Sequence, residues 1–498
     1  MIEQLTPTII IGIIAGYFLL LMVISYFTGR NSDNNDFFIA GRNSPWYLVA
    51  FGMVGTTLSG VTFISVPGWV EADQFSYMQM VFGYLLGYFV IATVLMPMYY
   101  KMNLTSIYTY LEERFGVAAY KTGAGFFLLS RTIGASFRLY LVAIVLQQFV
   151  MNAFGVPFWV TVLVTIILIW IYTFQGGIKT IVVTDTLQTL CMIVAVVATV
   201  IAIASKLNLS FGEIFSTINE SQYSQAFFFE GGWGDSKNFF KRFLAGASIA
   251  IVMTGLDQDM MQKNLSCKTL GDAQKNMFWF SIVLVFFKFL FLCLGALLFT
   301  YAIQVGIDIP ERKDLLYPTV ALQHLSPAIG IIFLLGLIAA AYSSADSALT
   351  ALTTSFCVDF LDFEKSDAEE AEKKRTRLWV HIGFSMLLFL VILVFWAINN
   401  DSVISAIFNV ASYTYGPLLG LYAFGFFTKR KITDKFAPIV CCLAPVLTFL
   451  IDEFSHVLLF GYQFGFELLI LNGALTFLGL LAISYPTIEE EELKIDKV

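Results

Sequence analysis

Runs of about 20 apolar residues recur along the whole chain, and this feature restricts its fold more than any other. The hydrocarbon core of a membrane contains no water to bond free peptide groups, so only helices and closed barrels can cross it. The runs are continuous and lack the alternating pattern of barrel strands. With 58% hydrophobic and 13% charged residues, the sequence predicts an all-α polytopic membrane protein.

The runs predict about 13 membrane spans. They cover residues 7–28, 46–66, 75–100, 123–154, 156–174, 180–205, 240–256, 276–304, 326–360, 378–398, 404–426, 436–451 and 465–484. With the N-terminus outside, roughly 20 Lys and Arg residues are cytoplasmic and about 6 are external, as the positive-inside rule requires. We therefore expect a multi-pass protein of the cell membrane with a cytoplasmic C-terminus.

The stretch LIAAAYSSADSALTALTT, Leu337–Thr354, is unusually polar for a membrane helix. Ala340, Ser343, Ser344 and Ser347 are spaced at i, i+3, i+4 and i+7, so they share one stripe. Neutral oxygens suit a small monovalent cation that has to leave again, and this stripe indicates such a site. Asp346 adds a charge that is costly in hydrocarbon unless it faces the bundle interior. Close helix packing through small residues is the simpler alternative.

Two predicted spans are interrupted by polar or helix-breaking residues. In GTTLSGVTFISVPGWV, Gly55–Val70, we expect Pro67 and Gly68 to break the helix near mid-span. In ASIAIVMTGLDQDMMQ, Ala247–Gln262, the apolar run turns polar at Asp257. The two breaks are five spans apart, which predicts an inverted repeat with a binding site near the membrane midplane. A proline kink and a helix that ends early would be the alternative.

Few ionisable residues lie inside the apolar runs. They are Arg131, Arg138, Asp185, Lys288 and Asp346. Such groups are functional candidates because an unpaired charge is costly in the membrane. Arg138 and Lys288 could instead extend to an interface.

The chain resembles the sodium:solute symporter family through motifs that span nearly its whole length. These are the break SGVTF-x-S-V-P-G, the run GGIKTIVVTDTLQT at Gly176–Thr189, the turn DQDMMQK, the helix AAYSSADS and the turn YGPLLG at Tyr415–Gly420. The resemblance implies a LeuT-like fold with discontinuous helices. The expected units are a peripheral helix and loop (1–45), a first five-helix repeat (46–205), an external loop (206–239), a second repeat (240–428), two peripheral helices (429–485) and an acidic cytoplasmic tail (486–498).

The resemblance also implies two cation sites. The family's sodium site maps onto backbone carbonyls of Gly55, Leu58 and Ala340 and onto the hydroxyls of Ser343 and Ser344. Its second site, found in some members, maps onto Asp185, Ser343, Asp346 and Ser347. Asp346 departs from the family pattern, in which this position is a serine. Two carboxylates at one site would bind a cation more strongly or share a proton, so one or two sodium ions, or protons, remain open.

For the substrate, the pattern of the family's sialic acid symporters gives a further set of matches. They are Ser59, Thr62, Phe75, Gln79 and Arg131, and we add Asp257 in the second break and Lys288, which falls near a lysine of sugar carriers. A guanidinium can bind a carboxylate through two hydrogen bonds. We therefore expect sodium-coupled import of a small organic anion, such as a sialic acid or another acidic sugar, by alternating access. A neutral sugar or an amino acid is the alternative substrate.

Other classes of protein fit the sequence less well. A channel would show a repeated filter motif or rings of charge, and a sensor would usually carry a soluble output domain. Only three histidines are present, without metal spacing, and there is no phosphate loop or nucleophile elbow, so we expect no enzyme. The acidic stretches near Asp367–Glu372 and Glu489–Glu492 read as solvated faces. The expected partners are substrate, sodium and lipid, with no nucleic acid, and the expected state is a monomer.

Overall fold

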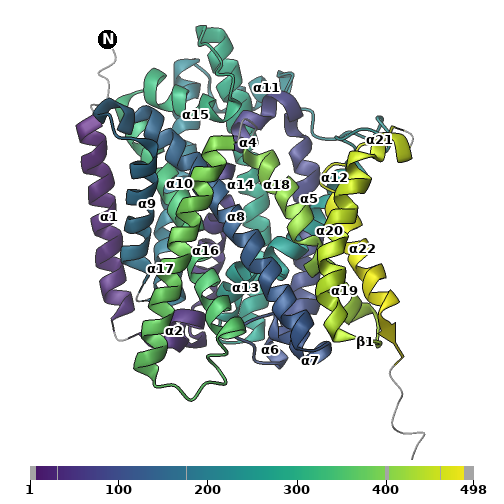
Figure 1. Ribbon diagram of the computed structural model, residues 1–498. Coiled ribbons are helices and arrows are strands. Elements are labelled where there is room, and N and C mark those ends of the chain that lie inside the picture. Colours follow the sequence, from purple (N-terminus) through teal and green to yellow (C-terminus); the bar gives the residue numbers. More distant parts are fainter. Residues whose placement is uncertain (1–6, 31, 175, 399–402, 460, 487–498) are drawn as a thin grey trace, which may run out of the picture.

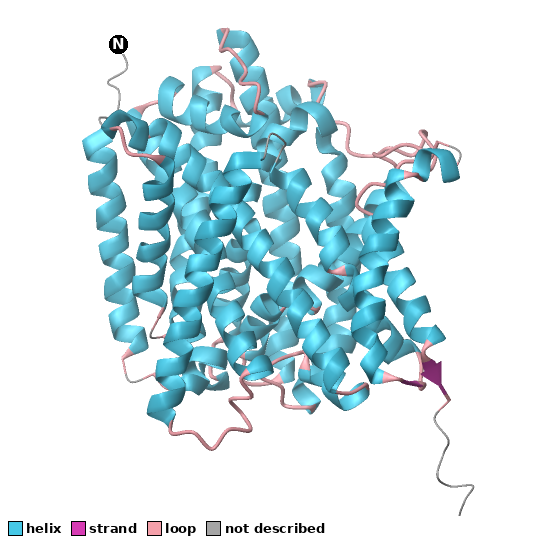
Figure 2. Ribbon diagram, viewed as in Figure 1, coloured by secondary structure: helices cyan, strands magenta, loops and turns pink. Residues whose placement is uncertain are grey.

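The apolar runs form long helices that stand side by side (Figure 2). The computed structural model describes residues 7–30, 32–174, 176–398, 403–459 and 461–486. The acidic residues Glu489–Glu492 lie outside the described residues. Within them, the only strands are β1 (Lys431–Ile432) and β2 (Ser484–Tyr485), which pair antiparallel at one end of the bundle. The all-α prediction is therefore confirmed.

The first eleven helices are α1 (Pro7–Gly29), α2 (Asn34–Ile39), α3 (Trp46–Leu58), α4 (Gly60–Asp73), α5 (Tyr77–Val90), α6 (Met96–Lys101), α7 (Thr109–Arg114), α8 (Val117–Phe149), α9 (Phe158–Thr173), α10 (Ile178–Lys206) and α11 (Phe211–Glu220). The others are α12 (Phe239–Ala250), α13 (Gln258–Leu265), α14 (Leu270–Val305), α15 (Leu316–Thr319), α16 (Pro327–Ser355), α17 (Glu370–Ile398), α18 (Val403–Thr414), α19 (Gly416–Phe427), α20 (Ala437–Glu453), α21 (Ser455–Leu458) and α22 (Leu468–Ala482). Short 3-10 or π segments join or extend them: η1 (Ala40–Arg42), η2 (Gln74–Ser76), η3 (Ile91–Leu95), η4 (Met151–Phe154), η5 (Ile251–Gly255), η6 (Lys313–Leu315), η7 (Val320–His324), η8 (Phe356–Phe360) and η9 (Asp434–Phe436).

The number of membrane crossings is bounded by helix length and apolarity. Among the described residues, 8 helices are long and apolar enough to span, or up to 9 if the bent pair formed by α12 with η5 and α13 is one span. Four shorter apolar helices are α3, α9, α19 and α22. In Figure 1, α1 begins at one end of the bundle and the β1–β2 pair lies at the other, as an odd number of crossings requires. The count of 13 stays a prediction.

The first interruption lies at Ser59, between α3 and α4, and not at Pro67 and Gly68. Ser59 has φ 17° and ψ 167°, which no helix accommodates, and the helix restarts at Gly60. The expected break at Pro67 is wrong, because this residue lies inside α4, which packs against α14 and η6. Gly68 instead allows close approach: a Cβ there would lie 2.5 Å from the carbonyl oxygen of Lys313.

The second interruption lies where the sequence predicts it. The axis bends by 63° between η5 and α13. Asp257 stands at the bend as the N-cap of α13, where its carboxylate accepts a 2.9 Å hydrogen bond from the Asp259 N–H. The carboxylate therefore satisfies one of the amide groups that a new helix start leaves free.

The centre of the bundle is formed by α16, which packs along α10 and also contacts α3, α4 and α8. Its residues from Phe333 onward are nearly all buried. By contrast, α1 and the pair α20 and α22 lie at opposite flanks in Figure 1. This arrangement sets the polar stripe of α16 opposite the broken span formed by α3 and α4.

Candidate functional site

The expected first cation site lies where the end of α3 meets the middle of α16. Leu58, Ala340, Ser343 and Ser344 are all buried. The hydroxyl oxygens of Thr56 and Ser343 are 3.3 Å apart, which joins the two helices directly. The structure thus brings into contact the two helices that carry the predicted ligands, and these ligand residues are buried.

Gly55 is required by the packing of α3 against α10. A Cβ at this position would lie 2.0 Å from Oγ1 of Thr189, whose hydroxyl donates to the Phe51 carbonyl at 3.1 Å. Any larger residue would push α3 away from α10. This close approach holds the backbone of α3, the first half of the broken span, against α10, which is continuous.

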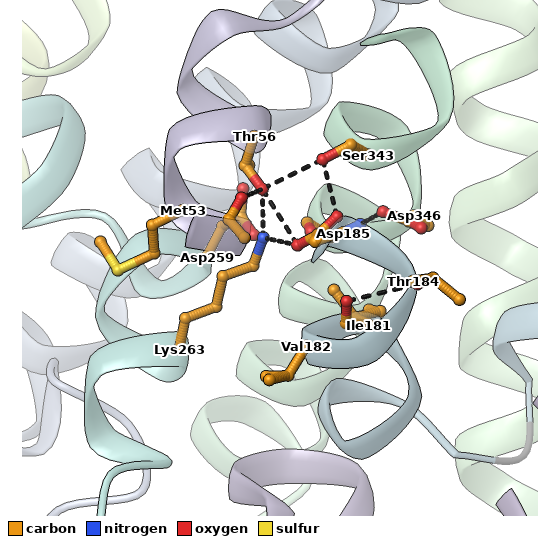
Figure 3. A network of polar contacts seen from close by, with 12 residues as sticks. Met53, Thr56, Ile181, Val182, Thr184, Asp185, Asp259, Lys263, Ser343 and Asp346 are labelled. Carbon is orange, nitrogen blue, oxygen red and sulfur yellow. Dashed lines mark hydrogen bonds and ion pairs between the residues drawn. The ribbon is translucent and has the colours of Figure 1, made fainter. Parts of the chain in front are cut away.

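Asp185 is the centre of a buried polar cluster that joins α3, α10, α13 and α16 (Figure 3). Its Oδ1 accepts a hydrogen bond from the Ser343 hydroxyl at 2.6 Å, and its Oδ2 accepts one from Thr56 at 3.1 Å. Oδ2 also lies 2.5 Å from Nζ of Lys263, which donates to Thr56 as well. Sequence reasoning named Asp185 and Ser343 but did not assign Lys263.

Asp346 belongs to the same region but faces another helix. Its Oδ2 accepts a 2.7 Å hydrogen bond from the Tyr172 hydroxyl of α9, and its Oδ1 accepts from the Ser347 N–H at 2.5 Å. The hydroxyl of Ser347 is buried and has no hydrogen-bond partner among the described residues. Of the four expected ligands of the second site, the structure shows direct contact between Asp185 and Ser343 and between Asp346 and Ser347.

A cavity opens beside the break at Ser59. Its lining includes Thr56, Thr57, Ser59, Thr62, Tyr77, Tyr84, Tyr88, Arg131, Arg138, Met253, Thr254, Met260, Lys288 and Phe408. Four of the expected substrate residues therefore share one cavity: Ser59, Thr62, Arg131 and Lys288. Sequence reasoning missed the three tyrosines and Thr57, whose hydroxyl is buried without a partner among the described residues. The i, i+7, i+11 spacing of the tyrosines was the available signal.

The three cationic side chains of this cavity have different surroundings. Arg131 forms an ion pair with Asp259, and its Nη1 lies 3.9 Å from Oδ2 of Asp257. By contrast, Nζ of Lys288 donates to the Thr62 hydroxyl at 2.7 Å, and Nη1 of Arg138 lies 3.5 Å from the Ser344 hydroxyl. No ion pair in the described part of the chain includes Arg138 or Lys288. Both line the cavity among the helices of the bundle.

Phe75 and Gln79, also expected to contact substrate, lie outside this cavity. The side chain of Gln79 accepts from the Phe228 N–H at 3.0 Å and donates to the Lys237 carbonyl at 2.8 Å. The N–H of Phe75 donates to the Gln225 carbonyl at 3.0 Å. Gln79 is about 200° around the helix from Tyr77, so it faces the loop before α12 when the tyrosines face the cavity.

Asp257 does not line the cavity either. It caps α13 and accepts a 2.5 Å hydrogen bond from the hydroxyl of Tyr415, between α18 and α19. The described residues contain no group of three or more His, Cys, Asp or Glu side chains that could hold a metal ion. The geometry instead offers hydroxyl and carbonyl oxygens for a monovalent cation beside a cavity with cationic walls.

These features define a secondary transporter built on broken helices, and comparison with known proteins gives its family. The model of the sodium:solute symporter family matches residues 37–435. The chain belongs to this family. It is a multi-pass membrane transporter that couples solute movement to sodium and is not an enzyme.

The relatives most similar in sequence include two bacterial proteins. The chain is 26% identical over 445 residues to the sodium/sialic acid symporter NanT of Aliivibrio fischeri, covering 85% of this chain and 83% of that protein. It is 23% identical over 439 residues to the sodium/sialic acid symporter SiaT of Proteus mirabilis, covering 84% of both.

The fold matches a solved transporter over nearly its entire length. A Na+-coupled sialic acid symporter in a substrate-bound outward-open state superposes with a TM-score of 0.82 at 20% identity. The match covers 95% of this chain and 97% of that one. The expected LeuT-like fold is confirmed.

Proposed function

We propose that this protein imports a small organic anion, a sialic acid or another acidic sugar, together with sodium. The observation that carries the proposal is the pair Arg138 and Lys288, two cationic side chains at one cavity without carboxylate partners among the described residues. A charge removed from water is costly unless an opposite charge accompanies it. A carboxylate-bearing substrate would supply that charge. The sialic acid relatives support the same class.

The Arg138 guanidinium is the proposed partner of the substrate carboxylate. Arg131 lines the same cavity but is already paired with Asp259, so replacing that partner would leave a buried carboxylate alone. Arg138 has no such competitor. The hydroxyls of Thr57, Ser59 and Thr62 are the proposed partners of the sugar hydroxyls, and the face formed by Tyr77, Tyr84 and Tyr88 would cover the ring.

The proposed sodium site is formed by the carbonyls of Gly55, Leu58 and Ala340 and by the hydroxyls of Ser343 and Ser344. Burial of these residues and the Thr56–Ser343 contact support it. Sodium bound there would hold the broken span against α16 while substrate occupies the cavity beside it. Because Arg138 lies 3.5 Å from Ser344, the substrate and sodium sites are neighbours, which would couple their occupancy.

Transport would proceed by alternating access in the cell membrane. The two proposed repeats, residues 46–205 and 240–428, would rock so that the cavity opens first outside and then inside. The N-terminus would be external and the C-terminus cytoplasmic. The membrane potential contributes about 2.3 kcal/mol per 100 mV for each net positive charge carried inward, so a monovalent anion offsets the contribution of one sodium ion. The proposed working unit is a lipid-embedded monomer without a nucleic-acid partner.

Thermal stability of the purified protein tests the proposal, because a ligand that binds the native state raises the melting temperature. We expect sodium to stabilise the protein relative to potassium or choline. Among sialic acids, short carboxylates, amino acids and neutral sugars, we expect a further shift only with the acidic sugars and only in sodium. A shift with neutral sugars alone would contradict the anion proposal, and equal melting temperatures in all three salts would contradict the sodium site.

A further inference from the structure

The Lys263 side chain lies at the position that a second coupling cation would need. Lys263 is in the last turn of α13, and its Nζ is 2.5 Å from Oδ2 of Asp185 (Figure 3). Both side chains are 1% exposed. The same ammonium donates to Thr56. The pair is therefore closed to solvent and joined to the broken span α3.

Every oxygen of the Asp185 carboxylate already has a donor. Oδ1 accepts from Ser343, and Oδ2 accepts from Lys263 and Thr56. In this arrangement the two hydroxyls direct their protons at the carboxylate. A sodium ion would need their lone pairs instead, so both would have to rotate and the ammonium would have to leave.

The charge at Asp185 is also satisfied. A buried carboxylate requires one compensating charge, and an ammonium in contact with it provides this without an ion from solution. Asp346, the second carboxylate of the expected site, forms no hydrogen bond with Asp185. Its oxygens accept hydrogen bonds from Tyr172 of α9 and from the Ser347 N–H. The position beside Asp185 is therefore already occupied by the Lys263 ammonium, and Asp346 is bonded away from it.

We propose that Lys263 is an internal cation that takes the place of a second coupling sodium at Asp185, so that one sodium ion accompanies each substrate molecule. This inference rests on the proposed sodium symport. Lys263 also sets the charge moved in a cycle: one sodium with one monovalent anion carries no net charge, whereas two would carry one. A methionine at position 263 would leave Asp185, Thr56 and Ser343 to a cation from solution.

The test counts bound sodium directly and needs no substrate. Purified protein in detergent is titrated with radioactive 22Na+ in choline chloride, and the ions bound per protein are measured at saturation. We expect one ion for the wild type and for Lys263→Arg, and two ions for Lys263→Met. The double variant Lys263→Met/Asp185→Asn removes both charges of the pair, and we expect it to bind one ion.

The outcomes separate this inference from the proposed function. No bound sodium in the wild type would overturn the symport proposal and the inference with it. Two ions in the wild type, or one ion in a folded Lys263→Met protein, would overturn the inference alone. If Lys263→Met does not fold, the wild-type count still decides, and the double variant gives a second count.

Discussion

The hydroxyl of Tyr415 donates a 2.5 Å hydrogen bond to Oδ2 of Asp257, and this contact joins two helix interruptions. Asp257 stands at the bend before α13, and Tyr415 separates α18 from α19. Arg131 adds α8 through its ion pair with Asp259. Arg131, expected from the sequence to bind substrate, is therefore part of a junction between three broken or crossing elements.

Replacing Arg131 should affect stability first. Arg131→Met would leave Asp259 buried without its counter-charge, a change that typically costs about 3 to 5 kcal/mol. We expect a large fall in melting temperature in detergent. Adding Asp259→Asn should recover part of the loss because the unpaired charge is then gone. An unchanged melting temperature in Arg131→Met with lost ligand binding would instead restore Arg131 as the substrate residue.

Replacing Arg138 should affect substrate binding first. Arg138→Met removes a guanidinium that has no carboxylate partner among the described residues, so we expect a nearly unchanged melting temperature without ligand. A charge-assisted hydrogen bond contributes about 1.5 to 3 kcal/mol, so affinity for sialic acid should fall about 10- to 150-fold. The measurement is the ligand concentration that gives half of the sodium-dependent thermal shift. Equal affinity in variant and wild type would rule out the proposed carboxylate contact.

Removing the Ser344 hydroxyl should weaken sodium binding. Ser344→Ala deletes one proposed oxygen ligand, and the loss of one such partner costs about 1 to 3 kcal/mol. The sodium concentration for half-maximal stabilisation should rise about 5- to 150-fold. Ser385→Ala is the matched control, because this buried hydroxyl of α17 donates only to its own helix at the His381 carbonyl. Normal sodium affinity in Ser344→Ala would contradict the site.

Gln79 should act as an anchor for the external loop. Gln79→Ala removes its bonds to the backbone at Phe228 and Lys237, together with a 3.3 Å bond to the Ser76 carbonyl of the preceding turn. We expect faster hydrogen exchange across residues 222–238 with unchanged affinity for substrate. Gln147→Ala is the control. Gln147 lies near the end of α8 and donates to the Val156 carbonyl, so its loss removes a similar bond to another loop. Slower uptake caused by lost substrate affinity, without faster exchange, would return Gln79 to the substrate site.

A methyl group at Gly68 should disturb the contact between α4 and the loop at η6. Gly68→Ala would bring its Cβ to 2.5 Å from the Lys313 carbonyl oxygen, so either backbone must shift. Overpacking of this kind costs about 1 to 3 kcal/mol. Gly134→Ala in α8 is the control, because no atom beyond its own stretch of helix lies within 4 Å of a Cβ there. The melting temperature should fall only in Gly68→Ala, and equal values would contradict the close contact.

Local patterns predicted the helices and the second break, but not the position of the first. The apolar runs report burial in lipid, and the polar turn at Asp257 marks a real helix start. At the first break, Pro67 and Gly68 were the stronger local signals, yet packing decided the outcome. Pro67 lies inside α4, which packs against α14 and η6, whereas the helix is interrupted at Ser59, where the adjacent Gly60 is a weaker breaking signal than a proline.

Candidate site residues could be predicted where one helix stripe carries them, but not where their contacts depend on distant segments. The spacing of Ser343, Ser344 and Ser347 is visible in the sequence because all lie on α16. The choice between Arg131 and Arg138 is not, because it depends on whether Asp259 lies opposite. Likewise, the position of Lys263 beside Asp185 depends on the 63° angle of the bend before α13; the sequence predicts where this break lies but not its angle.

The contact between Thr56 and Ser343 spans 287 residues, and this separation matters while the chain is being made. At about 5 to 20 residues per second, a ribosome needs about 15 to 60 seconds to reach Ser343 after Thr56. During that time the polar end of α3 has left the ribosome without its partner from α16. Until then the first broken span must be held by the insertion machinery or by other helices. It can reach its native position only after α16 has been synthesised.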